Sequence, residues 1–122
     1  MYISDPPTVQ IQQSSYSVTT GNSVTFVCTV TSTLPITTVY WQRNFGGSTS
    51  NINANANTGK YSGSTVNTPS LTIFNADSSD AGTYTCSASN SVGTGQSTTT
   101  FSVTGSKCIS LSSAFWLVDK YI

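Results

Sequence analysis

Few residues in this 122-residue chain could perform covalent or acid–base chemistry. The chain contains three Cys, four acidic residues that are all Asp, and 43 Ser and Thr, but it has no His and no Glu. Most enzymatic proton transfer uses His or Glu, and a Ser nucleophile needs a base beside it. The four Asp form no calcium-loop pattern either. The composition therefore argues against an enzyme and favours a binding or structural module.

Charge excludes a further class of partner. Charged residues make up 7% of the chain, and the formal net charge is zero with only four Lys and Arg. Nucleic-acid binding depends on clustered Lys and Arg that displace counterions from phosphates. We therefore expect no nucleic-acid partner and no small-molecule substrate, and no cofactor is implied.

The elements that position these residues are predicted to be short β-strands. Apolar residues alternate with polar ones in several runs, so that Val24, Phe26 and Cys28 share one face and Val39 and Trp41 share another. Turn residues separate the runs, and no helix is predicted before residue 106. The predicted strands are 24–30, 39–43, 71–73, 83–88 and one ending at 101–103, preceded by a strand with Val9, Ile11 and Val18 that is broken in its middle. The prediction is an all-β sandwich or barrel.

One set of residues carries a resemblance to a known family. Cys28, Trp41 and Cys86 have the order and spacing of a core Trp between two cysteines, and 80–86 reads D-x-G-x-Y-x-C. Over about residues 7–104 the chain resembles the immunoglobulin superfamily. The 57 residues between the two Cys, and the A-x-N-x-x-G run that follows Cys86, resemble the I-set, whereas K-Y-S-G-S at 60–64 resembles variable domains. The resemblance implies a two-sheet Greek-key β-sandwich.

The resemblance also implies roles for individual residues. Cys28 and Cys86 would form the disulfide between the sheets, which leaves no Cys cluster for zinc, and Trp41 would pack against it. Tyr84 would form the tyrosine corner, and Lys60 would pair with Asp80 across the bottom of the sandwich. A disulfide of this kind indicates an oxidising, extracellular or cell-surface location as part of a larger membrane-bound or secreted protein, although muscle I-set domains keep their thiols reduced in the cytosol.

Candidate partner contacts lie on one predicted sheet face and one turn. Tyr40, Gln42 and Asn44 point outward from a sheet that commonly docks partners in this superfamily, and Asn90 lies in the turn after Cys86. The alternative is an ordinary solvated strand face. The alternating Asn at 51–57 predicts either an edge strand or a plain loop, and Gly93 with Gly95 predicts a β-bulge.

The chain divides into three parts by these criteria. Residues 1–5 are a lead-in, 6–104 a single immunoglobulin-like domain, and 105–122 a tail outside the family pattern. The tail contains Cys108, a candidate free or intermolecular thiol, and apolar residues at helical spacing. This tail is either an end that is not part of the domain or a segment that packs on a sheet face or on a second chain.

The function that follows is an extracellular module for adhesion or receptor recognition through noncovalent protein contacts. A second copy of the chain is one candidate partner, and a membrane is reached only through other segments of the parent protein. The alternatives are a spacer module in a multidomain array with no ligand of its own, and a ligand-binding ectodomain of a receptor tyrosine kinase or invertebrate immune receptor.

Overall fold

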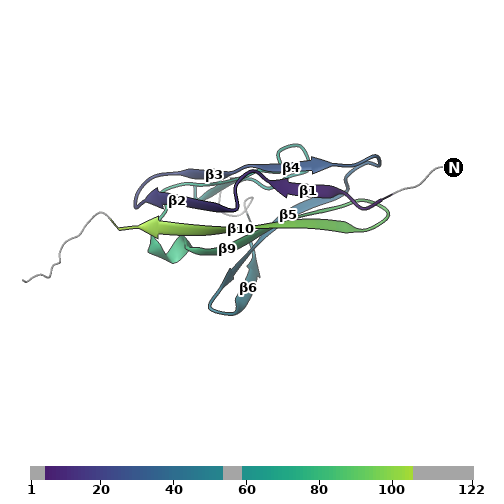
Figure 1. Ribbon diagram of the computed structural model, residues 1–122. Coiled ribbons are helices and arrows are strands. Elements are labelled where there is room, and N and C mark those ends of the chain that lie inside the picture. Colours follow the sequence, from purple (N-terminus) through teal and green to yellow (C-terminus); the bar gives the residue numbers. More distant parts are fainter. Residues whose placement is uncertain (1–4, 54–58, 106–122) are drawn as a thin grey trace, which may run out of the picture.

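Ten strands form two facing layers in the computed structural model, which describes residues 5–53 and 59–105 (Figure 1). One layer contains, in spatial order, β1 (Thr8–Ile11), β4 (Cys28–Thr31) and its continuation β3 (Val24–Phe26), β8 (Leu71–Ile73) and β7 (Tyr61–Gly63). The other contains β2 (Ser15–Thr19), β10 (Thr94–Thr104), β9 (Gly82–Ser89), β5 (Thr38–Phe45) and β6 (Ser48–Asn51). The chain crosses between the layers after β1, β2, β4, β6 and β8. This is the all-β, two-sheet Greek-key sandwich that the sequence predicts.

The first strand is broken where the sequence predicts a break, and its halves belong to different layers. β1 runs antiparallel to β4, whereas β2 runs parallel to β10. Between them the backbone N–H of Gln12 donates to the carbonyl of Val27 at 2.9 Å. Val27 interrupts the next predicted strand, and its own N–H donates to the Tyr16 hydroxyl at 3.1 Å. Side-chain and cross-layer hydrogen bonds thus satisfy the backbone at both breaks.

Alternation along the strands builds the core. The inward residues of β3, β5 and β9 are buried, and Trp41, Tyr84 and Phe26 have no exposed surface. Phe26 lies at the centre, with the rings of Tyr16, Trp41, Tyr84 and Phe101 between 4.9 and 5.7 Å from its own. Tilted and edge-on ring pairs of this kind add to the free energy gained by burying the rings.

A short 3₁₀ helix, η1 (Ser78–Asp80), precedes β9 and was not predicted from the sequence. Asp77 caps it by accepting from the backbone N–H of Ser79 at 2.9 Å, and the Asp80 carboxylate accepts in turn from the Asp77 N–H at 2.9 Å. This reciprocal pattern is a capping box with Asp in place of the usual Glu. Within residues 5–53 and 59–105, no helix is long and apolar enough to span a membrane.

Candidate binding face

The two layers are joined through the core beside Trp41. A disulfide links Cys28 of β4 to Cys86 of β9, 58 positions apart in sequence. Trp41 lies opposite Cys86 on the neighbouring strand and donates its indole N–H to the carbonyl of Pro69 at 2.7 Å. The ring is therefore buried with its only polar group satisfied, and β5 and β9 are held in a fixed register.

At the end of the sandwich where β9 begins, several contacts converge on Asp80. The Tyr84 hydroxyl donates to the Asp80 carbonyl at 2.5 Å, and the Lys60 ammonium donates to the Asp80 carboxylate at 2.6 Å. Asp80 is only 6% exposed. Burial raises the pKa of the Tyr84 hydroxyl, and hydrogen bonds from Ser79 lower the pKa of Asp77. These groups hold η1 against the start of β9.

Arg43 is a structural residue that the sequence reasoning missed. Its guanidinium donates to the Ala81 carbonyl at 2.7 Å and to the Ser79 carbonyl, and it lies 4.8 Å from the centre of the Phe45 ring. Gly82 accommodates this arrangement, because a Cβ there would lie 2.8 Å from the Asn44 carbonyl. The feature of the sequence that could have indicated this role is the basic residue two positions after Trp41.

The outer face of β10, β9, β5 and β6 carries rows of uncharged polar side chains. Strand register places Asn44 between Thr49 and Thr83, and Gln42 between Asn51 and Thr85. Each Thr of β9 also has a Thr opposite it on β10, so that Thr83 faces Thr100 and Thr85 faces Thr98. We call this surface the polar face and define it by its eight members: Gln42, Asn44, Thr49, Asn51, Thr83, Thr85, Gln96 and Thr98.

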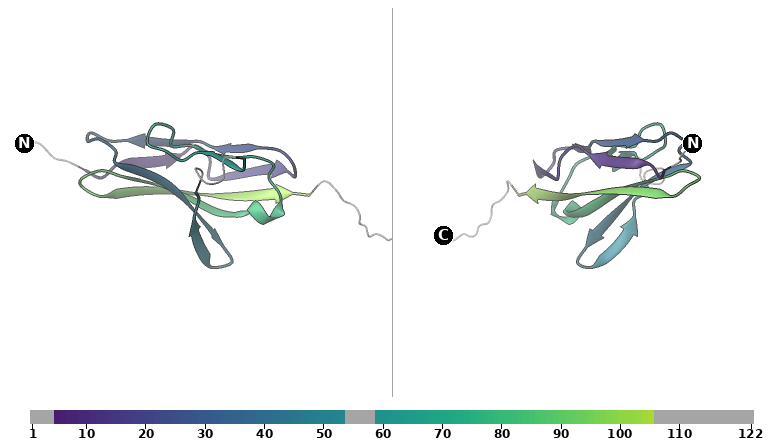
Figure 2. Two further views of the ribbon diagram at one scale, coloured as in Figure 1. Left: turned by 180° about the vertical axis from the view of Figure 1, so that it is seen from behind. Right: turned by 45° about the vertical axis from the view of Figure 1, so that its right-hand side comes forward.

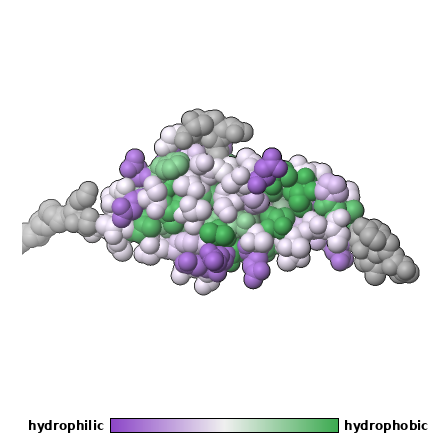
Figure 3. All heavy atoms as spheres, turned by 90° about the horizontal axis from the view of Figure 1, so that it is seen from above, coloured by the Kyte–Doolittle hydropathy of each residue, from purple (hydrophilic) through white to green (hydrophobic). Residues whose placement is uncertain are grey.

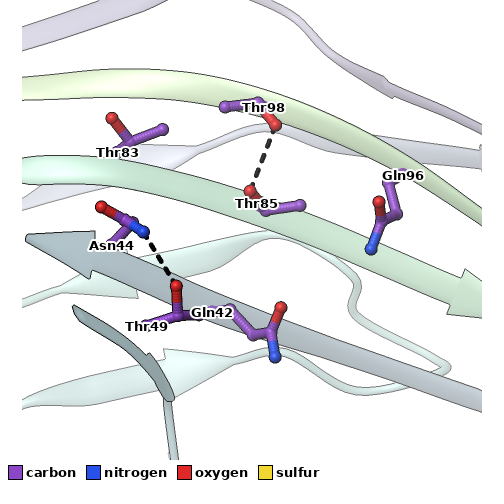
Figure 4. A pocket seen from close by; sticks show the side chains of 7 residues that line it. All are labelled: Gln42, Asn44, Thr49, Thr83, Thr85, Gln96 and Thr98. Carbon is purple, nitrogen blue, oxygen red and sulfur yellow. Dashed lines mark hydrogen bonds between the residues drawn. The ribbon is translucent and has the colours of Figure 1, made fainter. Parts of the chain in front are cut away.

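Hydrogen bonds run across the strands within the polar face. The Asn44 amide donates to the Thr49 hydroxyl at 2.8 Å, and the Gln42 amide donates to the Asn51 side-chain carbonyl at 2.9 Å. The hydroxyls of Thr85 and Thr98 are 3.1 Å apart (Figure 4). Seven of the eight members, all except Asn51, line a shallow hollow of about 350 Å³. The side chains are thus ordered by one another while remaining open to solvent.

Two further residues that the sequence predicted to contact a partner, Tyr40 and Asn90, are not members of the polar face. Tyr40 is half-buried on the same side of β5 as Gln42, opposite Ser87 of β9. Asn90 is 7% exposed, and its amide donates to the Asp5 carbonyl at 2.9 Å and to the Ser32 hydroxyl at 3.0 Å, while its side-chain oxygen accepts from two backbone N–H groups of the turn. Asn90 is therefore a structural residue, and its expected place in a partner face is corrected by its burial.

The sequence model of the immunoglobulin I-set domain matches residues 7–103. The chain belongs to the immunoglobulin I-set family. A curated relative of this I-set domain, the "Basement membrane-specific heparan sulfate proteoglycan core protein" of Mus musculus, is 37% identical over 92 residues, or 75% of the chain. The match spans about 2% of that protein's length.

Solved structures show the same fold. The I-set domain resembles the I-band fragment I67-I69 from titin with a TM-score of 0.67 and 31% identity, covering 83% of this chain and 33% of that one. A structure concerning Dscam isoform specificity has a TM-score of 0.68 at 19% identity, covering 83% of this chain and 25% of that one. In each case the I-set domain covers less than two thirds of the protein it matches.

The described part of this I-set domain contains no group of three His, Cys, Asp or Glu able to hold a metal ion. Cys108 and the rest of the predicted tail lie outside the described residues, apart from Gly105. The family match and the strand register leave the polar face as the candidate functional site.

Proposed function

We propose that this I-set domain is an extracellular recognition module that binds a protein partner through the polar face. The observation that carries the proposal is an ordered, hollowed sheet face built only from hydroxyl and amide side chains. Gln42 and Asn44, which the sequence reasoning selected, lie at its centre, and Tyr40 extends it along β5. Binding by such a face is noncovalent and needs no cofactor.

The chemistry of the polar face suits a protein surface. A docked partner removes water from the face, and uncharged hydroxyls and amides lose far less solvation than ions do. Amides and hydroxyls both donate and accept, so each can pair with backbone or side-chain groups of a partner. A partner that leaves them unpaired pays about 1–3 kcal/mol for each buried group, which is a source of specificity.

The disulfide and the proteoglycan relative support an extracellular location. Disulfides such as Cys28–Cys86 persist in oxidising compartments, and the proteoglycan relative is named for the basement membrane. The rest of the molecular surface is also poor in charge. Seen from the β3–β8–β7 side, most of it has intermediate hydropathy, with small separate hydrophilic and hydrophobic patches (Figure 3).

A spacer module without a ligand is the second candidate, favoured by the 31% identity to the titin fragment. The two candidates differ in what a substitution on the polar face should do. A spacer depends on stability alone, so equal surface changes on either layer should have equal effects. A recognition module should lose binding only when the layer that carries the polar face is changed.

Thr85→Lys, compared with Thr72→Lys, provides this test. Both residues are half-buried Thr in a strand that pairs with a neighbour on each side, and each shares a hydrogen bond with a Thr hydroxyl on the next strand. The chain is displayed as a tetramer, and its binding to cell surfaces and matrix is measured. We expect Thr85→Lys to abolish binding and Thr72→Lys to preserve it. Equal binding by both variants, or none by the unaltered chain, would contradict the recognition proposal.

A further inference from the structure

The outer edge of β6 differs from the other sheet edges of the molecule. β1 and β2 lie against strands of the opposite layer, and β7 is only three residues long. β6 instead forms half of a hairpin with β5 that projects from the body, as all three views show (Figures 1 and 2). Among residues 5–53 and 59–105 no strand pairs with its outer edge, and all four of its residues are exposed.

The hairpin geometry determines which backbone groups this edge presents. Gly46 and Gly47 form a two-residue turn with φ of 60° and 86°, the conformation of a type I′ turn. The Ile52 N–H donates to the Trp41 carbonyl at 2.9 Å, and bonded pairs alternate with unbonded pairs along an antiparallel ladder. Ser50 therefore bonds to β5, while the N–H and C=O of Thr49 and Asn51 point away from it.

This edge lacks the features that normally prevent strands from pairing. Protein sheets protect open edges with Lys, Pro, bulges or inward charges, and Ser48–Asn51 contains none of these. Because the edge is neutral and the chain has no net charge, two identical edges do not repel each other. The projecting hairpin also keeps the bodies of two molecules apart.

We propose that β6 pairs antiparallel with β6 of a second copy, joining two five-stranded sheets into one around a two-fold axis. Outward-pointing groups must meet outward-pointing groups, and residues opposite each other in an antiparallel pair share a face. One register satisfies both conditions for the whole strand. Ser50 lies on the axis, and Thr49 exchanges both backbone hydrogen bonds with Asn51 of the second copy, which gives four bonds per dimer.

This pairing deepens the proposed function, on which it rests for its biological role. Thr49 and Asn51 belong to the polar face, so the rows of both copies would continue across the axis as one double-width face. A four-residue edge buries less area than the roughly 1,200 Å² of stable interfaces. The dimer is accordingly weak and concentration-dependent. Weak pairings of this kind become effective when many copies on two facing surfaces pair at the same time.

Disulfide trapping tests both the pairing and its register. Opposed unbonded residues have Cα atoms about 4.5 Å apart, within the range of a disulfide. The full chain carrying Cys108→Ser receives either Ser50→Cys or Ser48→Cys, two exposed positions on the same side of the same strand. In the proposed register the two copies of residue 48 are about 13 Å apart. With a mild oxidant added to accept the two electrons, we expect Ser50→Cys to form covalent dimers at least about tenfold faster than Ser48→Cys. Equal rates, or a strict monomer in sedimentation at millimolar concentration, would overturn the proposal.

A second substitution tests the edge of β6 independently of the polar face. Thr49→Pro removes an outward N–H that β5 does not use, so the hairpin should form while trapping of Ser50→Cys falls to the Ser48→Cys rate. Thr49→Lys gives the same result if the proline variant melts early. Thr85→Lys lies two strands from the edge and should leave trapping unchanged. Trapping without cell binding would refute the proposed function alone, and cell binding without trapping would refute the pairing alone.

Discussion

At the scale of single residues, the Tyr84 hydroxyl supports one of the tightest regions of the molecule. It is fully buried and is bonded to the Asp80 carbonyl, whose residue also carries the salt bridge to Lys60. Tyr84→Phe leaves that carbonyl without this donor, which should lower the free energy of unfolding by about 1–3 kcal/mol. Urea denaturation measures the loss, and Tyr40→Phe on the outer face, where the ring is half-buried, should lose less.

The same hydroxyl predicts the alkaline limit of stability. Burial raises the pKa of Tyr84 in the folded protein above its ordinary value near 10. A raised folded pKa means that the stabilisation is complete below about pH 10 and is lost as pH rises further. Absorbance of tyrosinate should therefore show Tyr84 ionising together with unfolding. Ionisation of every tyrosine before the fold is lost would contradict this.

The thiols provide a test of the proposed compartment. With Cys28 and Cys86 bonded, only Cys108 remains to react with an alkylating reagent in the chain as secreted from cells. Mass spectrometry of the intact, non-reduced protein should find a single alkylated Cys or a Cys108-linked dimer. Three alkylated Cys would refute the extracellular location.

Individual roles were predictable from the sequence only where a spacing pattern specifies them. Gln42 and Asn44 follow Trp41 by one and three positions on a strand of period two, so their outward direction was foreseeable. Asn90 was not, because its burial depends on Asp5 and Ser32, which are distant in sequence. Arg43 binds carbonyls of a turn almost forty positions away, and no local pattern announces such a contact.

At the scale of elements, Gly95 shows how closely the segment before β1, at Pro7, lies against β10. The sequence predicted a bulge at Gly93 and Gly95, but pairing with β9 runs without interruption from Thr94. A Cβ at Gly95 would lie only 2.0 Å from the Pro7 carbonyl oxygen. The glycine is needed because one backbone passes directly over another.

Gly95→Ala should therefore destabilise the domain by about 1–3 kcal/mol, as expected for overpacking against a backbone that cannot easily yield. Gly93→Ala is the matched control, since its Cβ would make an ordinary 3.4 Å contact with the Pro6 ring. Thermal melting of the two variants measures the difference. Equal melting temperatures would contradict this and show that the backbone at Pro7 moves aside at no cost.

Strands with one buried face were predictable, and elements without one were not. β3, β5 and β9 bury alternate apolar residues, with Ser87 of β9 as an additional buried position, and this alternation leaves period two in the sequence. β6 buries nothing, so its Ser and Thr gave no signal in the sequence. Of the Asn run at 51–57, predicted to be either an edge strand or a loop, Asn51 ends β6, and residues 54–57 lie outside the described residues. η1 is a single turn stabilised by Asp77 and Asp80 rather than by apolar periodicity.

At the scale of the whole molecule, the absence of His dictates a flat response to pH. No side chain in the chain has an ordinary pKa between about 5 and 8. The free energy of unfolding should therefore be constant across that interval.

Below that interval, stability should fall because of Asp77. Hydrogen bonds from Ser79 lower the pKa of Asp77 in the folded protein, so the stabilisation that its carboxylate provides is present above about pH 4 and is lost as pH falls further. Urea midpoints across pH 2–8 measure the profile, and Asp77→Asn should shrink the acid limb while leaving the plateau flat. A stability step between about pH 5.5 and 7.5 would contradict this expectation, because no side chain of the chain ordinarily titrates in that interval.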